Sequence, residues 1–170
     1  DLEDRFIREN IKYKVVGGLR FYERAEIKDA LAFFRLLIKS DDNLSFERII
    51  NIPKRGLGSV FLRKLNDFAK KNNLSLLDSL RKYLETETLS KGPRDNITMF
   101  LKVLDKHKEM LKNKDHFEVA GALLDDIGYT DMLKNEKTIE SEGRLENLKK
   151  LIGYLLKLFL NIEEDLRLRN

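Results

Sequence analysis

The sequence predicts a mainly α-helical protein with a short helix and strand at its N-terminus. Only nine glycines and two prolines occur among 170 residues, which is typical of a helix-rich chain. Apolar residues recur every three or four positions from residue 24 onward, whereas a strand-like run occurs only before Gly17. At roughly 150 residues per domain, the length suits one helical domain with a remnant of a neighbouring one.

The N-terminal residues are expected to form the edge of an α/β domain. Leu2–Arg8 favour a helix, and Tyr13–Val16 favour a short strand that ends at Gly17 and Gly18. The chain therefore divides into residues 1–23, the remnant and its connection, and residues 24–170, the helical body. Residues 1–10 are highly charged and lack an initiating methionine, which indicates a piece of a longer chain.

Two helices are expected before residue 53. The first has one apolar face, formed by Ile27, Ala30, Leu31, Phe34, Leu37 and Ile38. It should end at residues 40–43, whose short polar side chains compete for backbone hydrogen bonds. The second covers Phe46–Ile50 with Ser45 as its N-cap, and Pro53 closes it because the residue before a proline avoids the helical region.

Three helices are expected in the middle of the chain. Apolar spacing predicts one through Phe61–Ala69, and the next should begin at Ser75, whose hydroxyl can cap a helix. Gly92 and Pro93 are expected to break the chain before a long helix through residues 97–111.

Two further helices should complete the chain. One begins at Asp115 and ends at Gly128, a residue type favoured just after a helix. The other carries an apolar stripe over residues 145–159. The longest apolar run is interrupted by Lys157 and is shorter than the roughly 20 residues that span a bilayer, so no membrane partner is expected.

Several kinds of chemistry are excluded by residue type or spacing. The absence of cysteine excludes disulfides, thiolate metal sites and a cysteine nucleophile, and it suits the reducing cytoplasm. No phosphate-cradling G-x-x-x-x-G-K-[ST] loop occurs, and His107 and His116 lack partners at ligand spacing. We therefore predict no catalytic residue and no metal site in this chain.

Positive charge is concentrated in residues 48–71. That segment holds seven basic residues and one acidic residue, although the whole chain carries only +4. The basic residues are Arg48, Lys54, Arg55, Arg63, Lys64, Lys70 and Lys71. Such a local excess attracts polyanions such as nucleic acid. The alternative interpretation is a lysine-rich helix face in contact with solvent.

A helix, a tight turn and a second helix are predicted around Gly56-Leu57-Gly58. Glycine allows positive φ and lets another molecule approach the backbone. The amides from Leu57 to Val60 would begin the second helix without intrahelical acceptors and could bind a phosphate. Leu57 would fill the core, while Lys54, Arg55, Arg63 and Lys64 would reach neighbouring phosphates. Alternatively, this is an ordinary turn in which glycine only closes a helix.

Three segments resemble the UvrD/PcrA/Rep family of superfamily 1 DNA helicases. Residues 13–36 are similar to the family's Val-Gly-Gly-x-x-Phe-Phe-x-Arg-x-Glu-Ile-Lys-Asp segment, which leaves subdomain 2A and enters subdomain 2B. Residues 46–58 resemble its Gly-Ile-Gly duplex-binding motif, with Leu57 in place of isoleucine. Residues 128–148 are similar to a late 2B segment, and the likeness fades after Gly153.

The resemblance implies that this chain is a multi-helix 2B-type subdomain with a short helix–strand remnant of the α/β (RecA-like) 2A subdomain. Residues 1–23 would be the 2A remnant and hinge, and residues 24–170 would be 2B. The parent protein would be an ATP-dependent 3′–5′ DNA helicase that acts in repair or replication restart. Its ATP and Mg²⁺ would bind outside this stretch, so no cofactor is expected here and the fragment alone should be inactive.

The resemblance also implies roles for individual residues. The duplex-binding turn would comprise Lys54, Arg55, Gly56, Leu57, Gly58 and Ser59, with Arg63 and Lys64 on the following helix. The hinge would comprise Gly17, Gly18, Phe21, Arg24 and Glu26. The implied partners are duplex DNA, fork junctions, the parent's 1A, 1B and 2A subdomains and repair proteins, at the bacterial nucleoid in the cytoplasm. The alternative is a helical protein-interaction or regulatory module without direct DNA binding.

Overall fold

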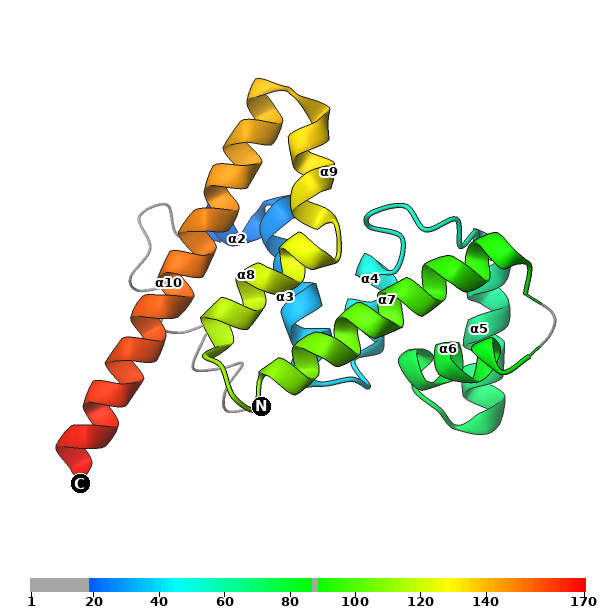
Figure 1. The fold of residues 1–170 in the computed structure, drawn as a ribbon, viewed down its shortest axis with the longest axis horizontal. Coiled ribbons are helices and arrows are strands. Elements are labelled where there is room, and N and C mark those ends of the chain that lie inside the picture. The colour runs from blue at the N-terminus through cyan, green and yellow to red at the C-terminus, as the bar shows by residue number, and fades with distance from the viewer. Residues whose placement is uncertain (1–18, 87–88) are drawn as a thin grey trace. The chain divides into compact units, whose positions relative to one another are not determined.

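The structure, a computed structural model, describes residues 19–86 and 89–170 (Figure 1). These residues form nine helices and no strand, which confirms the mainly α fold class. The helices are α2 (Leu19–Glu23), α3 (Ala25–Ile38), α4 (Asn43–Ile49), α5 (Ser59–Asn72), α6 (Leu76–Leu84), α7 (Lys91–Met110), α8 (His116–Asp126), α9 (Tyr129–Glu136) and α10 (Ile139–Arg169). The helix, strand and glycine pair predicted before residue 19 lie outside the described residues.

The chain separates into two compact units. One unit contains the residues up to Ala30 together with Leu133–Asn170, and the other contains Leu31–Met132. Both boundaries fall inside helices, in α3 and in α9. The predicted division between residues 23 and 24 coincides with the end of α2, and it stays a prediction as a subdomain boundary.

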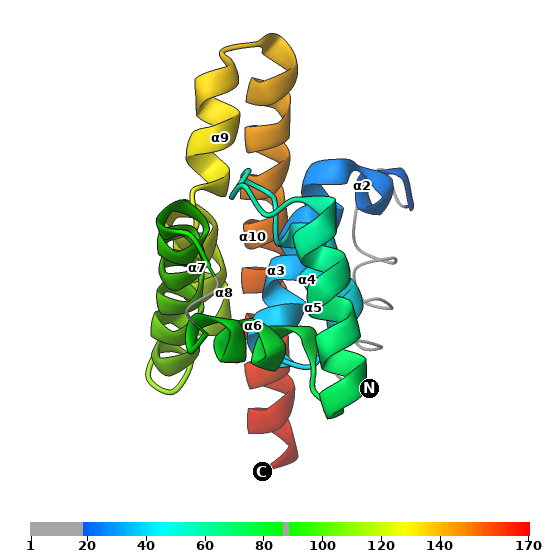
Figure 2. The same cartoon turned by 90° about the vertical axis from the view of Figure 1, so that its right-hand side faces the viewer.

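The unit Leu31–Met132 has an aromatic core. Phe46 of α4 and Phe100 of α7 meet edge to face, with ring centroids 6.4 Å apart, and both are almost fully buried. Phe33 and Tyr129 form a second such pair at 5.9 Å. Helix α8 packs beside α7, as Figure 2 shows, and α6 contacts α4, α5 and α7. These contacts fix α4 and α5, the helices that flank the predicted DNA-binding turn.

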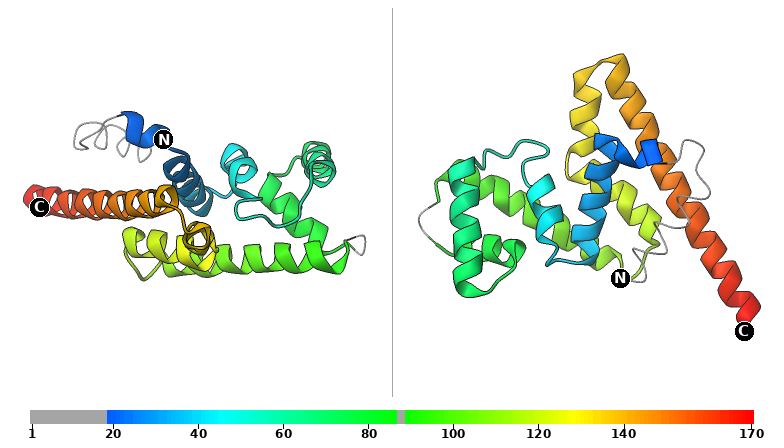
Figure 3. Two further views of the ribbon diagram at one scale, coloured as in Figure 1. Left: turned by 90° about the horizontal axis from the view of Figure 1, so that it is seen from above. Right: turned by 180° about the vertical axis from the view of Figure 1, so that it is seen from behind.

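The other unit is built around the long helix α10. A reversal after α9 places Lys137 at a φ of 51°, and α10 then begins with Thr138 as N-cap (Figure 3, right). Thr138 and Ser141 exchange side-chain to backbone hydrogen bonds, a reciprocal cap that fixes the first turn. The sequence predicted the apolar stripe of this helix but neither its start nor the preceding α9. Within the described residues, no helix has both the length and the apolar character needed to cross a membrane.

Two predicted helix starts are wrong. The N-cap of α4 is Asp42, whose Oδ1 accepts from the Ser45 amide, so Ser45 lies inside the helix. Gly92 and Pro93 do not break the chain, because α7 begins at Lys91 and both lie in its first turn. Proline is tolerated there because that turn needs no intrahelical amide donor.

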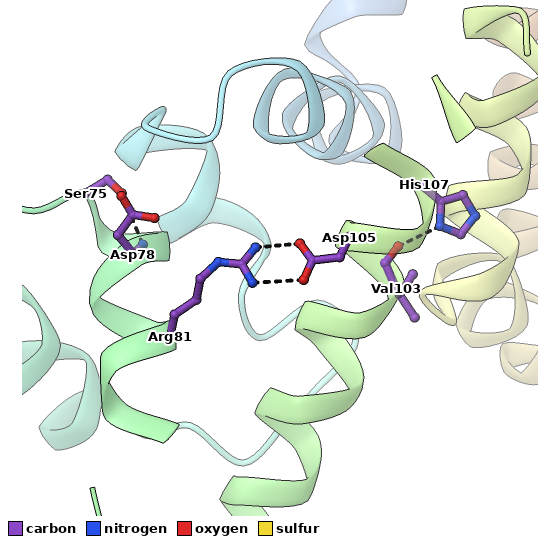
Figure 4. Close-up of polar contacts among 6 residues, drawn as sticks. All are labelled: Ser75, Asp78, Arg81, Val103, Asp105 and His107. Atoms are coloured by element: carbon purple, nitrogen blue, oxygen red, sulfur yellow. Dashed lines mark hydrogen bonds and ion pairs between the residues drawn. The ribbon is translucent and has the colours of Figure 1, made fainter. Parts of the chain in front are cut away.

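Replacing Ser75 by alanine should lower the free energy of unfolding by about 1 kcal/mol. The Ser75 hydroxyl accepts from the Asp78 amide at 3.1 Å, and the substitution leaves that amide without its partner (Figure 4). Ser90 is the matched control, because it caps α7 without a side-chain hydrogen bond. Urea denaturation of both variants tests this prediction, and equal losses would contradict it.

Candidate nucleic-acid interface

The candidate interface is the hairpin turn, residues 50–58, between α4 and α5. Gly56 has a φ of 71°, in the left-handed region that favours glycine. Gly58 is the N-cap of α5 with φ −72° and ψ 175°, a conformation open to any residue. A Cβ at Gly58 would meet no atom of the described residues within 4 Å, so this exposed position has open space around it. Only Gly56 therefore needs the conformational freedom predicted for the pair.

Helix α5 begins with backbone amides that find no acceptor in the described part of the chain. The first intrahelical bond runs from the Leu62 amide to the Gly58 carbonyl, so the amides of Ser59, Val60 and Phe61 precede the helical ladder and have no acceptor in the described residues. These donors lie at the positive end of the helix dipole, where anions bind favourably.

Leu57 is held inside the turn by Asn51. The Leu57 side chain is buried, as predicted. Its amide, however, donates to Asn51 Oδ1 at 3.2 Å, and Asn51 Nδ2 donates to the Leu57 carbonyl. The prediction that the Leu57 amide is free is therefore wrong, because the side-chain oxygen of Asn51 accepts its hydrogen bond. Asn51 carries no charge, so the charge pattern of the sequence did not point to it.

Three of the predicted cations, one in the turn and two on α5, form no ion pair within the described part of the chain. Lys54 lies in the turn, and Arg63 and Lys64 lie on α5. All three are exposed, and none forms an ion pair with any described residue. These side chains can therefore reach an external anion.

Arg55 lies inside the protein, in contrast to its neighbour Lys54. The Arg55 residue is 8% exposed, and its Nη1 donates to the carbonyls of Ile49, Ile50 and Ile52 at 3.0, 2.7 and 3.2 Å. The prediction that this side chain reaches a phosphate is therefore wrong for this structure. Burial lowers the pKa of Arg55 to about 10, which still leaves the guanidinium charged at neutral pH.

The predicted hinge residues lie in the unit that contains α10. Phe21 packs edge to face on Tyr154 at 5.6 Å. Glu26 is 2% exposed and accepts from Arg24 Nε at 2.7 Å and from Asn147 Nδ2 at 3.0 Å. Burial alone would raise the pKa of Glu26, but the hydrogen bonds from Asn147 and Arg24 outweigh it, so that the pKa is lowered. Gly17 and Gly18 lie outside the described residues.

Other polar groups of the same unit as the turn connect helices. Arg81 of α6 forms a two-pronged ion pair with Asp105 of α7 at 2.9 and 2.6 Å (Figure 4). His107 is fully buried, with Nδ1 2.7 Å from the Val103 carbonyl and Nε2 3.0 Å from Asp126. Among the described residues, no three His, Asp or Glu side chains are grouped closely enough to hold a metal ion.

Comparison with known proteins matches this chain to helicases. The family model described as "UvrD-like helicase C-terminal domain" matches residues 1–168. A probable DNA helicase II homolog of Rickettsia felis is 39% identical over 150 residues, which are 88% of this chain and 23% of that protein. The ATP-dependent DNA helicase PcrA of Staphylococcus epidermidis is 37% identical over 156 residues, 89% of this chain and 21% of that protein.

The matches extend over nearly the whole chain, although the chain spans only about a fifth of the length of these relatives. The matched region includes both the hairpin turn and the residues around Glu26. Together with the all-helical fold of the described residues, this match shows that the chain belongs to the UvrD-like helicase C-terminal domain family.

Proposed function

We propose that this chain is a duplex-DNA-binding accessory region, of the 2B type, in an ATP-dependent 3′–5′ DNA helicase. The names of the relatives, DNA helicase II and PcrA, support the helicase activity of the parent protein. Duplex and fork DNA would be the substrate, the parent's other subdomains would be partners, and the protein would act at the nucleoid of a bacterial cell. We also propose that repair proteins are partners and that this region regulates unwinding by the parent helicase.

The observation that supports DNA binding best is the combination of free amides and open space at the start of α5. Ser59, Val60 and Phe61 offer amides without acceptors in the described residues, and nothing within 4 Å would meet a Cβ at Gly58. Lys54 and Arg63, which form no ion pair with residues 19–86 or 89–170, flank this position in sequence. A phosphate of the DNA backbone fits such a site, and contacts to it do not depend on the base sequence. The first residues of α5 are therefore the proposed phosphate contact.

Replacing Gly58 by alanine should weaken duplex binding about tenfold, the order of one missing charge-assisted hydrogen bond. The methyl group would occupy the space through which a phosphate approaches, whereas the backbone of Gly58 tolerates any residue. Fluorescence anisotropy with a labelled duplex measures the affinity, and thermal unfolding checks the fold. Gly143→Ala on α10 is the control, since its methyl group also meets nothing within 4 Å.

Salt dependence separates phosphate binding from the alternative protein-interaction role. Replacing Lys54, Arg63 and Lys64 together by glutamine should reduce the slope of log affinity against log salt by about 0.9 for each phosphate that the protein no longer neutralises. The triple variant Lys70→Gln, Lys71→Gln, Lys82→Gln has the same net charge and should keep a steeper slope. Unchanged duplex binding in the first variant and in Gly58→Ala would favour the interaction module.

A further inference from the structure

We propose that Arg55 is a positioning residue, which holds the hairpin turn from inside so that the first amides of α5 and Lys54 meet the DNA. This inference rests on the proposed DNA-binding function of the turn. It assigns opposite roles to two adjacent cations: Lys54 is exposed and has no ion-pair partner among the described residues, whereas Arg55 is buried and bonded to the protein.

The Arg55 guanidinium donates hydrogen bonds to carbonyls at the C-terminal end of α4. Its Nη1 lies within 3.2 Å of the carbonyls of Ile49, Ile50 and Ile52, which are the last residue of the helix, its C-cap and the residue before Pro53. The carbonyls at the end of a helix carry the negative end of the dipole and need donors from outside the helix, and the Ile49 carbonyl also accepts from the Ile52 amide. A buried cation therefore satisfies them more strongly than a neutral donor would.

The same residue is anchored to α7 at two points. The Arg55 guanidinium carbon lies 4.7 Å from the centre of the Phe100 ring, a cation–π contact. The Arg55 carbonyl accepts from Asn96 Nδ2 at 2.8 Å. The side chain and the carbonyl of Arg55 thus connect the end of α4 to α7 and fix the turn immediately before Gly56.

The anchoring of Arg55 determines where the binding groups point. Gly56 follows Arg55 directly, and Leu57 is held by Asn51 through its amide and its carbonyl. Between Asn51 and Gly58 the chain is thus fixed at Arg55 and at Leu57, and α5 begins immediately afterwards. A turn that is ordered before DNA arrives loses less conformational entropy on binding. Loosening Arg55 should therefore weaken DNA binding without removing any group that touches DNA.

Arg55→Lys distinguishes positioning from charge. Lysine keeps the positive charge, but its ammonium group cannot lie flat on the Phe100 ring while it donates to the same carbonyls. We expect Arg55→Lys and Arg55→Met to weaken duplex affinity by similar factors of about tenfold. Lys54→Gln should cost less and should reduce the salt slope by about 0.9. Wild-type affinity in Arg55→Lys with a loss only in Arg55→Met would overturn the proposal, because charge alone would then suffice.

A matched control excludes general destabilisation. Leu123→Ala removes a fully buried side chain of α8 and should lower the melting temperature while duplex affinity stays at the wild-type value below the transition. Asn96→Ala removes only the anchor of the Arg55 carbonyl and should share the affinity loss of the Arg55 variants. If all variants lost affinity in proportion to melting temperature, Arg55 would be a purely structural residue.

Hydrogen exchange tests the positioning role separately from DNA binding. The Leu57 amide should exchange faster in Arg55→Lys and Arg55→Met than in the wild-type chain or Lys54→Gln, because the turn that holds it against Asn51 loosens. Unchanged protection at Leu57 in both Arg55 variants would refute the inference even if the chain binds DNA. Faster exchange in the Arg55 variants, together with a wild-type chain that binds no duplex, would refute only the proposed function.

Discussion

Replacing Phe100 by alanine should lower the free energy of unfolding by about 4 kcal/mol, the largest loss we expect from a single substitution in this core. The ring is 1% exposed, packs on Phe46 with centroids 6.4 Å apart, and supports the Arg55 guanidinium at 4.7 Å. The substitution therefore creates a cavity between α4 and α7 and also removes the partner of a buried cation. Urea denaturation measures the loss as a lower midpoint.

Met99 provides the control for Phe100, because it is adjacent on α7 and 66% exposed. Met99→Ala should change the free energy of unfolding by less than about 0.5 kcal/mol. Phe100→Leu keeps most of the apolar volume and should cost about 1 to 2 kcal/mol, and it still removes the aromatic face beneath Arg55. A loss below about 1 kcal/mol for Phe100→Ala would show that the aromatic pair does not support this core.

The helices could be predicted because apolar spacing is a property of each segment alone. The face formed by Ile27, Leu31 and Phe34 lies within α3, and the residues before Gly128 form α8 as expected. The starts of helices were less predictable. Asp42 and Ser45 are both suitable N-caps, and the choice between them depends on which backbone amide is left free. Helix α9 was missed because its eight residues carry too short an apolar pattern.

The site was predictable only in part, because the charge pattern of a sequence does not distinguish a buried cation from an exposed one. Lys54 and Arg55 are adjacent and carry the same charge at neutral pH, yet only Lys54 is exposed. The burial of Arg55 depends on Phe100 and on the carbonyls at the end of α4, a three-dimensional arrangement that local sequence does not show. Asn51 and Asn96 carry no charge, so nothing in the pattern singled them out as the side chains that hold the turn.

Replacing Glu26 by glutamine should lower the free energy of unfolding by about 2 kcal/mol at pH 7. Glu26 is almost fully buried and connects α3 to α10 through Asn147, and its Oε2 accepts from both Asn147 Nδ2 and Arg24 Nε. Glutamine keeps an acceptor but loses the charge that strengthens both hydrogen bonds. Glu23→Gln, on the exposed face of α2, is the control and should have little effect.

The pH dependence of this loss has a definite sign. Burial alone would raise the pKa of Glu26. The hydrogen bonds from Asn147 and Arg24 lower it by more than burial raises it, so the pKa in the folded chain lies below the ordinary 4.5. The unfolded chain therefore binds a proton at Glu26 before the folded chain does, and the stabilisation is complete above pH 4.5 and lost as pH falls through the folded pKa. The difference in unfolding free energy between wild type and Glu26→Gln should thus stay constant from about pH 7 down to about pH 4.5 and shrink as the pH falls further, as urea denaturation can measure.

A double-mutant cycle locates the source of this stabilisation. If Asn147 is the main partner, Asn147→Ala and Glu26→Gln should be coupled, so that the double variant loses less stability than the two single losses together. Two results would contradict a stabilising hydrogen bond between Glu26 and Asn147. One is a stability difference between wild type and Glu26→Gln that grows toward low pH, and the other is a double variant whose loss equals the sum of the two single losses. With the coupling present, Glu26 is bound to α10, and a hinge motion at Glu26 would have to break this hydrogen bond.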